Sequence, residues 1–381
     1  MAGGILLTFR RLVKEILQAR KLCLLSPNTC GTGRLVFRRF AVRKRFERLE
    51  RFELVRRKEM KILGIAILAL VILLPATPLS AQITKPVYIS LPSAGNVQHV
   101  ALGAAKYKGF YEEMGVPNAQ VVFLRGNSVN VQAIVSGSVQ FASAFGPSMH
   151  TMFRGEQLRI LVQIFNQIPF GLITKPEVNR LEDLKGTKIA VTFGGSTHSV
   201  LIALLAKYGI AQNFAEYLNI PGDQAKTAAL MQGRAAAALM SPPADRFLLK
   251  EGFKRLVYMG DVFKGVPFSA LLTTSKVIRE EPDLVERVVK AVVKTLLFIR
   301  ENRDGGIEAI MNHSKVDKEI ATSLYDLMRD AYAPVLSPEG VMQRAELEIA
   351  TLKERPNFDP KAFIDDRFLK AALRSMGRKE Q

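Results

Sequence analysis

An apolar run near residue 62 divides this chain of 381 residues and limits how much of it can belong to one fold. The run covers 62–74, follows a methionine and a lysine, and is broken by proline at its end. Its length suits the hydrophobic part of a secretory signal and is short for a bilayer-spanning helix, which needs about 20 residues. We therefore predict a signal peptide over residues 60–81, cleaved near Ala81, and a mature fold that begins beyond it.

Residues 1–59 precede this segment and carry more than half of the chain's net positive charge. They contain 16 Lys and Arg and 5 Asp and Glu, a net of +11, which leaves +8 of the total +19 for the rest. Since the basic character belongs to this extension, we expect no nucleic-acid partner. We interpret 1–59 as sequence before a misassigned start codon. A membrane-surface segment, suggested by the aromatic and cationic residues of 38–58, and a disordered segment are the alternatives.

Cysteine and histidine usage argues against metal and disulfide chemistry. Cys23 and Cys30 are the two cysteines of the sequence and both lie in the extension, while the four histidines are scattered without an HExxH pair. We therefore expect no disulfide-rich scaffold, no metal site and no cofactor. Apolar residues make up 48% of the chain, which predicts a folded core.

Short apolar runs alternate with helical patterns beyond residue 82. Continuous runs such as Val87–Leu91 are typical of strands covered on both faces, and Val97–Met114 and Ser196–Tyr208 have helical patterns. This alternation predicts an α/β fold with mostly parallel sheets and crossover helices. The other expected strands are Val121–Leu124, Val139–Ser143, Arg159–Ile164, Gly171–Thr174, Lys188–Thr192, Ala235–Met240 and Ser269–Thr274.

The C-terminal hundred residues have a helical pattern throughout. Pro282 can occupy the first position of a helix, and apolar residues then recur at four-residue spacing to about Arg300. Further helices are expected at 305–312, 317–332, 338–353 and 360–376.

Four polar strand-to-helix turns are candidates for a ligand site. In open α/β sheets, ligands bind beyond the carboxyl ends of strands and at helix N-termini. Any one of these turns is as well explained by helix capping, whereas four of them facing one cleft indicate a site. Together with a proline-rich turn after the strand at 235–240, they supply the candidate contacts Ser93, Asn96, Asn127, Ser143, Gly146, Ser148, Gly195, Ser196, Thr197, His198 and Pro242.

Ser196 and Thr197 are the strongest pair in this set. They follow two glycines and open a helix, so amides, hydroxyls and a positive helix end suit a carboxylate, sulfonate or phosphate. The turn lacks the GK[ST] ending of a phosphate-binding loop, which argues against nucleotide hydrolysis. His198 has no mature cysteine and no GxSxG serine to activate. We therefore expect no catalytic residue and no enzyme, and His198 is left with a ligand hydrogen bond or a structural role.

Several other side chains have two interpretations each. Asp245 would cap the helix at 244–251 or bind a ligand amine. The phenylalanines at 145, 193 and 268 would line the cleft or belong to the core. His313 falls in the helical tail and is expected on the surface.

Five segments of the mature chain carry a recognisable pattern in order: KYKGFYEEMG (106–115), IVSGSVQFA (134–142), LEDLKGTKIAV (181–191), MQGRAAAAL (231–239) and PDLV (282–285). Together they resemble motifs of the solute-binding proteins of nitrate/sulfonate/taurine-type ABC importers. The resemblance covers about 83–355 and departs from the family at Gln140 and Ala237, where an acidic residue is usual, and at the paired prolines 242–243.

The resemblance implies a two-lobed periplasmic binding fold of the second type, with hinge crossovers near 173–176 and 267–270. The first lobe is expected to comprise 83–172 plus 270–381, and the second lobe 176–267. A periplasmic receptor is implied that traps a small anionic or polar organic solute and delivers it to an ABC permease in the inner membrane. We expect it to be a monomer.

Two alternatives remain open at this stage. Thiamine pyrimidine-precursor synthases share this domain, but they need a cytosolic setting and cysteine-bearing motifs that the mature chain lacks. A receptor of the same fold can also feed a sensor instead of a permease, and neighbouring genes would separate these two cases.

Overall fold

The computed structural model describes residues 85–124, 126–155 and 157–379. They all belong to one compact unit of the chain. The signal peptide expected at 60–81 and the extension 1–59 lie outside the described residues. Within the described ranges, no helix combines the length and the apolar character needed to cross a bilayer.

Five strands form the first sheet in the order β2-β1-β3-β10-β4. β1 pairs in parallel with β2 and β3, whereas β10 is antiparallel to β3 and β4. β10 therefore enters this sheet from a distant part of the chain. The strands are β1 (Val87–Leu91), β2 (Ala119–Phe123), β3 (Phe141–Ala142), β4 (Leu158–Phe165) and β10 (Ser269–Thr274).

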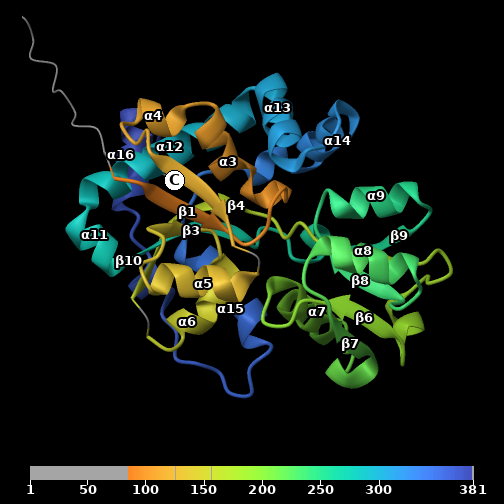
Figure 1. Cartoon of the computed structure of the whole chain (residues 1–381). Coiled ribbons are helices and arrows are strands. Elements are labelled where there is room, and N and C mark those ends of the chain that lie inside the picture. The colour runs from red at the N-terminus through yellow and green to blue at the C-terminus, as the bar shows by residue number, and fades with distance from the viewer. Residues whose placement is uncertain (1–84, 125, 156, 380–381) are drawn as a thin grey trace, which may run out of the picture. The chain divides into compact units, whose positions relative to one another are not determined.

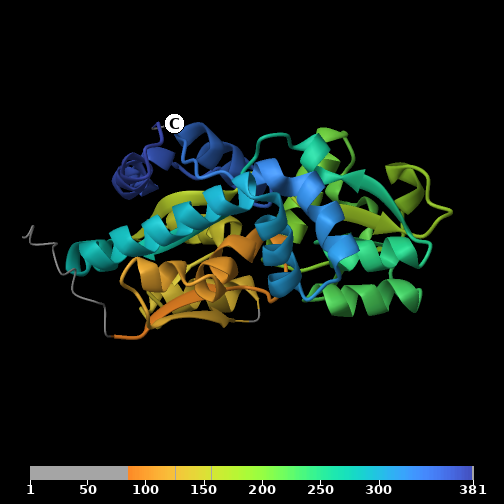
Figure 2. The ribbon, with the colours of Figure 1, turned by 90° about the horizontal axis from the view of Figure 1, so that it is seen from above.

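Helices cover both faces of the first sheet, which explains why its strands are apolar throughout. Figure 1 shows α3 (Val100–Tyr107) and α12 (Pro282–Glu301) above the strands, and α5 (Asn127–Val135) and α6 (Phe145–Met152) below them. α12 packs on α3 and reaches β4, and Figure 2 shows its length beside the sheet.

A second sheet of five strands follows the order β7-β6-β8-β5-β9. β6 is parallel to β7 and β8, and β5 is antiparallel to β8 and β9. α7 (Ser196–Lys207) and α8 (Asp223–Met231) pack on β8, while α9 (Ala244–Lys250) packs on β5 and β9. The strands are β5 (Gly171–Thr174), β6 (Lys188–Val191), β7 (Glu216–Asn219), β8 (Ala237–Met240) and β9 (Lys254–Tyr258).

The predicted α/β architecture is confirmed, but the sheets are mixed and not mostly parallel, because β5 and β10 each run antiparallel to both of their neighbours. The strands that the prediction missed have physical causes. The strands predicted at 87–91, 171–174 and 269–274 have these bounds in the structure. β7 and β9 are absent from the prediction because they carry charged residues and are mostly half-buried or exposed. Neither one therefore shows the continuous apolar run of a central strand.

The helix predicted over 97–114 is divided into shorter pieces. A 3-10 turn at Val97–His99 precedes α3, and α4 (Phe110–Glu113) follows Gly109. Gly109 has φ of 74°, in the left-handed region that glycine adopts without steric cost, so it ends the first helix and redirects the second.

Two crossovers connect the sheets. The chain leaves β4 through 166–170 and returns to β10 through α10 (Met259–Val262) and the residues after it. The aromatic rings of Phe170 and Phe268 pack edge to face with centroids 4.9 Å apart, so the two crossovers lie side by side. The crossovers fall a few residues before the predicted hinge positions, because β5 begins at Gly171. The predicted lobe boundaries remain a prediction. Below, each sheet with its helices is called the first or second lobe.

The remaining helices complete the C-terminal part. α13 packs on α3, α12 and α14, and α16 packs on α12. α15 contacts α6 of the first lobe and α7 of the second lobe, which makes it the tail helix most relevant to a site between them. The tail contains α11 (Ser275–Glu280), α13 (Arg303–Ser314), α14 (Lys318–Met328), α15 (Pro338–Ile349) and α16 (Arg367–Ser375).

Candidate functional site

The N-termini of α6 and α7 occupy equivalent places in the two lobes. α6 begins shortly after β3, and α7 begins shortly after β6, so each helix starts beyond the carboxyl end of a strand. α15 packs against both helices. Unpaired amides make each helix N-terminus positive, and two such ends beside one tail helix form a natural place for an anion.

Arg344 of α15 connects the two helix starts. Its Nη2 donates to Ser196 Oγ at 2.9 Å, although Ser196 belongs to the second lobe. A Cβ on Gly146 would lie 1.7 Å from this nitrogen, so only glycine allows the guanidinium to rest against the first turn of α6. The guanidinium carbon is 5.9 Å from the ring centroid of Phe268. The predicted residues Gly146 and Ser196 are thus brought together by an arginine.

Glu348 lies one turn further along α15 and binds three partners. Its carboxylate accepts from Arg344 Nη2 at 2.6 Å and from Ser199 Oγ at 3.0 Å, and lies 3.1 Å from His150 Nε2. Burial raises the pKa of Glu348, but Arg344, His150 and Ser199 together hold it below its ordinary value. Glu348 is therefore an ionised carboxylate in the interior, and it links α6, α7 and α15.

Sequence patterns did not single out Arg344 and Glu348, because an Arg–Glu pair four residues apart is typical of a solvated helix face. A usable signal does exist in the spacing. Val341, Ala345 and Glu348 recur at three- and four-residue intervals, and Arg344 lies next to this stripe. Such spacing places both ionic residues on or beside the apolar face of the helix.

Side chains of α7 and β7 accept hydrogen bonds from the loop before α7, and this loop lies against the first lobe. The amide of Thr192 donates to Thr197 Oγ1 at 2.9 Å, and the amide of Phe193 donates to Asn219 Oδ1 at 3.0 Å. Asn127 Nδ2 of α5 would be 3.0 Å from a Cβ on Gly195. Asn127 and Gly195 are therefore a second predicted pair that meets across the lobes.

Other predicted contacts have partners elsewhere. Asn96 reaches the second lobe, where its Nδ2 lies 3.5 Å from Asp223 Oδ2. Ser143 Oγ is 3.1 Å from His99 Nδ1, and Ser148 Oγ donates to the Ala144 carbonyl of its own helix at 2.7 Å. Ser143 and Ser148 are therefore already paired within the first lobe. Ser93 is half-buried and Pro242 is buried.

The histidines differ from expectation at one position. Burial lowers the pKa of His198, whose ring lies 5.0 Å from that of Phe193. Burial lowers the pKa of His99 to about 3, with His313 adding to the effect. His313, expected on the surface, is half-buried, because its ring packs into the space left by Gly103, where a Cβ would lie 2.5 Å from Nδ1. Burial lowers the pKa of His313 to about 4.

Asp245 is fully buried in the first turn of α9, whose N-cap residue is Pro243, and neither of its carboxylate oxygens accepts a hydrogen bond. Its Oδ2 lies 3.8 Å from Arg255 Nη1, in ion-pair range but beyond a hydrogen bond. Burial raises the pKa of Asp245 to about 6, against the opposing effect of Arg246 and Arg255. The capping role expected from the sequence is therefore wrong. The three phenylalanines differ in exposure, since Phe145 and Phe268 are buried and Phe193 is 47% exposed.

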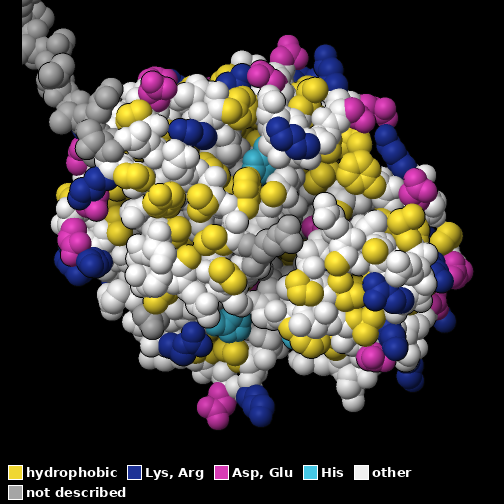
Figure 3. All heavy atoms as spheres, viewed as in Figure 1, with side chains coloured by type: hydrophobic (Ala, Val, Ile, Leu, Met, Phe, Trp, Pro, Cys, Tyr) yellow, Lys and Arg dark blue, Asp and Glu magenta, His cyan; other side chains and the backbone are white. Residues whose placement is uncertain are grey.

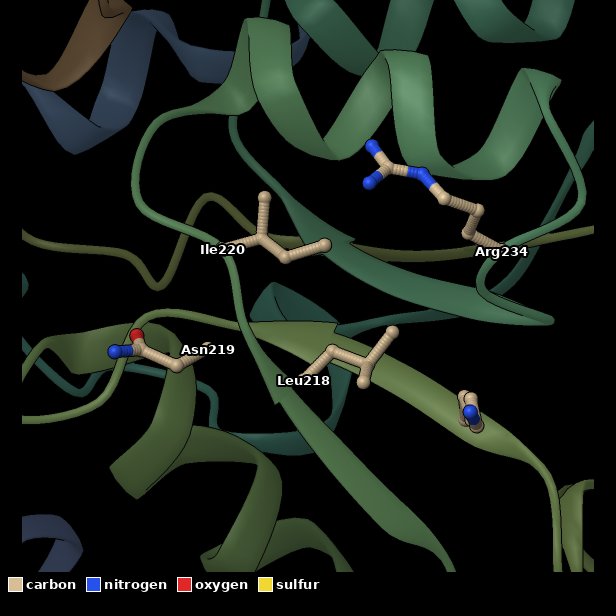
Figure 4. Close-up of a pocket in the computed structure, with 5 residues that line it drawn as sticks. Leu218, Asn219, Ile220 and Arg234 are labelled. Atoms are coloured by element: carbon tan, nitrogen blue, oxygen red, sulfur yellow. The ribbon is translucent and has the colours of Figure 1, made fainter.

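Two surface hollows lie away from the helix starts. One, of about 390 Å³, opens beside the second sheet, where Leu218 and Ile220 face a space that Arg234 enters from the other side (Figure 4). The other, of about 330 Å³, lies along the crossovers and includes Asn166 and Gly260. Neither contains a predicted ligand contact, so we assign the solute site to neither.

The charge distribution and metal-ligand geometry add two limits. On the face seen in Figure 3, Lys and Arg side chains are spread among acidic and polar ones instead of gathering in one basic patch. Among the described residues, no group of three or more His, Cys, Asp or Glu side chains is arranged to hold a metal ion.

Comparison with known proteins identifies the family. The family described as NMT1/THI5 like matches residues 96–305, which is more than half of the chain. The taurine-binding periplasmic protein of Escherichia coli (strain K12) is 29% identical over 212 residues, covering 54% of this chain and 65% of that protein. The chain thus spans slightly less than two thirds of this relative's length.

Solved structures with the same fold have low sequence identity. The alkanesulfonate-binding protein SsuA from Xanthomonas axonopodis pv. citri bound to MOPS has a TM-score of 0.62 at 17% identity, covering 75% of this chain and 100% of that one. The nitrate-binding protein NrtA from Synechocystis PCC 6803 has 0.67 at 15%, covering 78% and 90%. The desulfurization enzyme DSZB has 0.55 at 15%, covering 76% and 99%. The chain therefore belongs to the NMT1/THI5-like family and has the two-lobed, type II periplasmic binding protein fold.

Proposed function

We propose that this protein is the extracytoplasmic solute-binding subunit of an ABC importer, which traps a small anionic or polar organic solute between its lobes. The observation that carries the proposal is the meeting of Gly146 and Ser196, from helix starts of different lobes, at one buried arginine. The sequence relation to a taurine-binding periplasmic protein supports it. The fold shared with SsuA and NrtA is compatible with it.

The binding residues are proposed from both lobes. Gly195, Ser196 and Thr197 would present the first amides of α7 to the solute, and Gly146 those of α6. Asn96 and Asn127 would contribute from the first lobe, since both already reach toward the second. The other proposed contacts are Ser93, Ser143, Ser148, His198 and Pro242.

The mechanism is binding coupled to closure. The paired crossovers around Phe170 and Phe268 would allow the lobes to separate and admit the solute. Closing would remove water from the helix starts and strengthen their electrostatic attraction for an anion. The closed form would then dock on a permease in the inner membrane, with the protein acting as a periplasmic monomer.

An enzyme of this fold is the alternative function, because DSZB shares the architecture. Ser143 and His99, 3.1 Å apart, form the described pair closest to a nucleophile and its base. The pKa of His99, lowered to about 3 by burial and by His313, makes it a poor proton acceptor, and no carboxylate bonds to it within the described ranges. We therefore favour binding over turnover.

Calorimetry and thermal shift on the full-length chain, purified after expression, test the function. The ligand panel should include taurine, alkanesulfonates, nitrate, carboxylates and neutral solutes such as pyrimidines. We expect one class to bind saturably and to raise the melting temperature, and mass spectrometry to recover it unchanged. Chemical conversion of the bound compound would refute the proposal, as would the absence of binding across the panel.

A further inference from the structure

Arg344 has hydrogen-bond donors that no neighbouring group in the described protein accepts. A guanidinium carries five N–H donors on three nitrogens. Nη2 donates to Glu348 and to Ser196. Nε and Nη1 are buried and have no partner among the described residues. Because the residue is 0% exposed, bulk water does not reach these two nitrogens either. Leaving such charged donors unsatisfied in the interior is destabilising, so an acceptor that the described chain does not provide would stabilise this position.

The electrostatic surroundings specify the charge of that acceptor. The guanidinium lies against the first turn of α6, at Gly146, and against the first residue of α7, at Ser196. Each helix start contributes roughly half a positive charge. Glu348 balances the charge of Arg344, so the two helix starts leave an excess of about one positive charge. A monoanion would neutralise this excess.

We propose that Arg344 is the anion-binding residue of the solute site, that Glu348 positions it, and that the solute carries a carboxylate or sulfonate group. This inference rests on the proposed function and names its solute class. An oxygen of either acid group can accept from Nε–H or from Nη1–H, which point to different sides of the guanidinium. α15 lies beyond residues 96–305, which match the family, so this contact comes from outside the matched region.

The arrangement of α15 explains how the arginine is held. Glu348 accepts from Nη2, and is itself fixed by Ser199 of α7 and His150 of α6. Phe268 lies beside the guanidinium and is 8% exposed. A long, flexible side chain is thereby held in one position before the solute arrives, which lowers the entropy cost of binding.

Paired variants with a matched control test the inference on the full-length chain. The test variant is Arg344→Gln with Glu348→Gln, which removes one positive and one negative charge. The control is Arg287→Gln with Asp283→Asn, another i,i+4 pair, on α12, where Arg287 Nε is 2.9 Å from Asp283 Oδ2. Calorimetry would measure binding of taurine and of C1–C8 alkanesulfonates and carboxylates, each compared with its neutral amide.

We expect the natural chain to bind at least one anion and to bind its neutral amide at least about tenfold more weakly. The test pair should lower anion affinity at least about tenfold, and the control pair should leave it unchanged. Arg344→Lys, which keeps the charge but moves the donors, should also weaken binding. Circular dichroism would establish that each variant is folded. If the test pair does not fold, the comparison of anion with amide and the Arg344→Lys variant still decide.

Three results would overturn the inference. These are an unchanged anion affinity in the folded test pair, an unchanged affinity in Arg344→Lys, and a natural chain that prefers the amides. If the natural chain binds a neutral solute but no anion, the inference fails while the proposed receptor function stands. If it binds no solute of any class, the proposed function fails with it.

Discussion

Replacing Glu348 by Gln should destabilise the folded protein strongly and in a pH-dependent way. The carboxylate is 2% exposed and pairs with Arg344, which is 0% exposed. Removing one partner of a buried ion pair leaves the other charge uncompensated, and typically costs about 3–5 kcal/mol. Because Gln keeps an acceptor oxygen for Ser199 and Arg344, we expect the lower end, about 3 kcal/mol.

The pH dependence follows from the direction of the pKa shift. Burial opposes ionisation of Glu348, but Arg344, His150 and Ser199 lower its pKa below the ordinary value of 4.5 overall. The carboxylate therefore contributes stability above pH 4.5, and this contribution is lost as the pH falls through the lower, folded-state pKa. The difference in stability between the natural chain and the variant should shrink over the same interval.

Urea unfolding between pH 3 and pH 7.5, followed by circular dichroism, measures this difference. Glu346→Gln is the matched control, because Glu346 lies on the same helix and pairs with Arg355 at the surface. Exposed ion pairs contribute little, so this control should behave as the natural chain. A Glu348→Gln protein that is as stable as the control, or a stability difference that does not vary with pH, would refute the buried-pair argument.

Three further changes have defined outcomes. Burial raises the pKa of Asp245 from 3.8 to about 6, so the natural chain should lose at most about 3 kcal/mol of stability as the pH rises through this interval. Asp245→Asn cannot ionise, so the variant should not show this loss. Urea unfolding over this pH range measures the two free energies of unfolding, and an equal pH dependence in both proteins would contradict the prediction. Gly146→Ala should displace Arg344 and destabilise the fold by about 1–3 kcal/mol, measured by thermal melting, because its Cβ would lie 1.7 Å from Nη2; an unchanged melting temperature would argue against the close contact. Ser196→Ala with Thr197→Val should weaken solute binding at least about tenfold, or about 1.4 kcal/mol, as measured by calorimetry. An unchanged affinity would show that neither hydroxyl contributes to solute binding.

The sequence predicts most of the architecture because burial leaves a clear pattern. Val87–Leu91 and Ser269–Thr274 are apolar enough to be recognised as covered strands, and α12 shows its buried stripe at four-residue spacing. β9 carries lysine and arginine and lacks that pattern, although it pairs with β5. From the sequence, Gly109 is compatible with the interior of one helix over 97–114. The left-handed backbone at Gly109 shows that the first helix ends there.

The candidate site is predictable only in part, because polar turns are visible in the sequence and their meeting is not. Gly195 and Ser196 can be recognised as a helix start, whereas Arg344 joins them from a position 148 residues further along the chain. His313 shows the same limit, because only the packing against Gly103 reveals that its ring is half-buried. Interactions between distant elements depend on how the sheets and tail pack, which local periodicity does not encode.

The central claim is that the two helix starts and Arg344 hold an intact solute, and a crystal structure with the solute bound tests it most directly. The expected result is an unaltered carboxylate or sulfonate placed between the N-termini of α6 and α7, within hydrogen-bond distance of Arg344. A solute seated in the hollow beside Leu218 and Ile220, or density for a chemically converted compound, would contradict the claim.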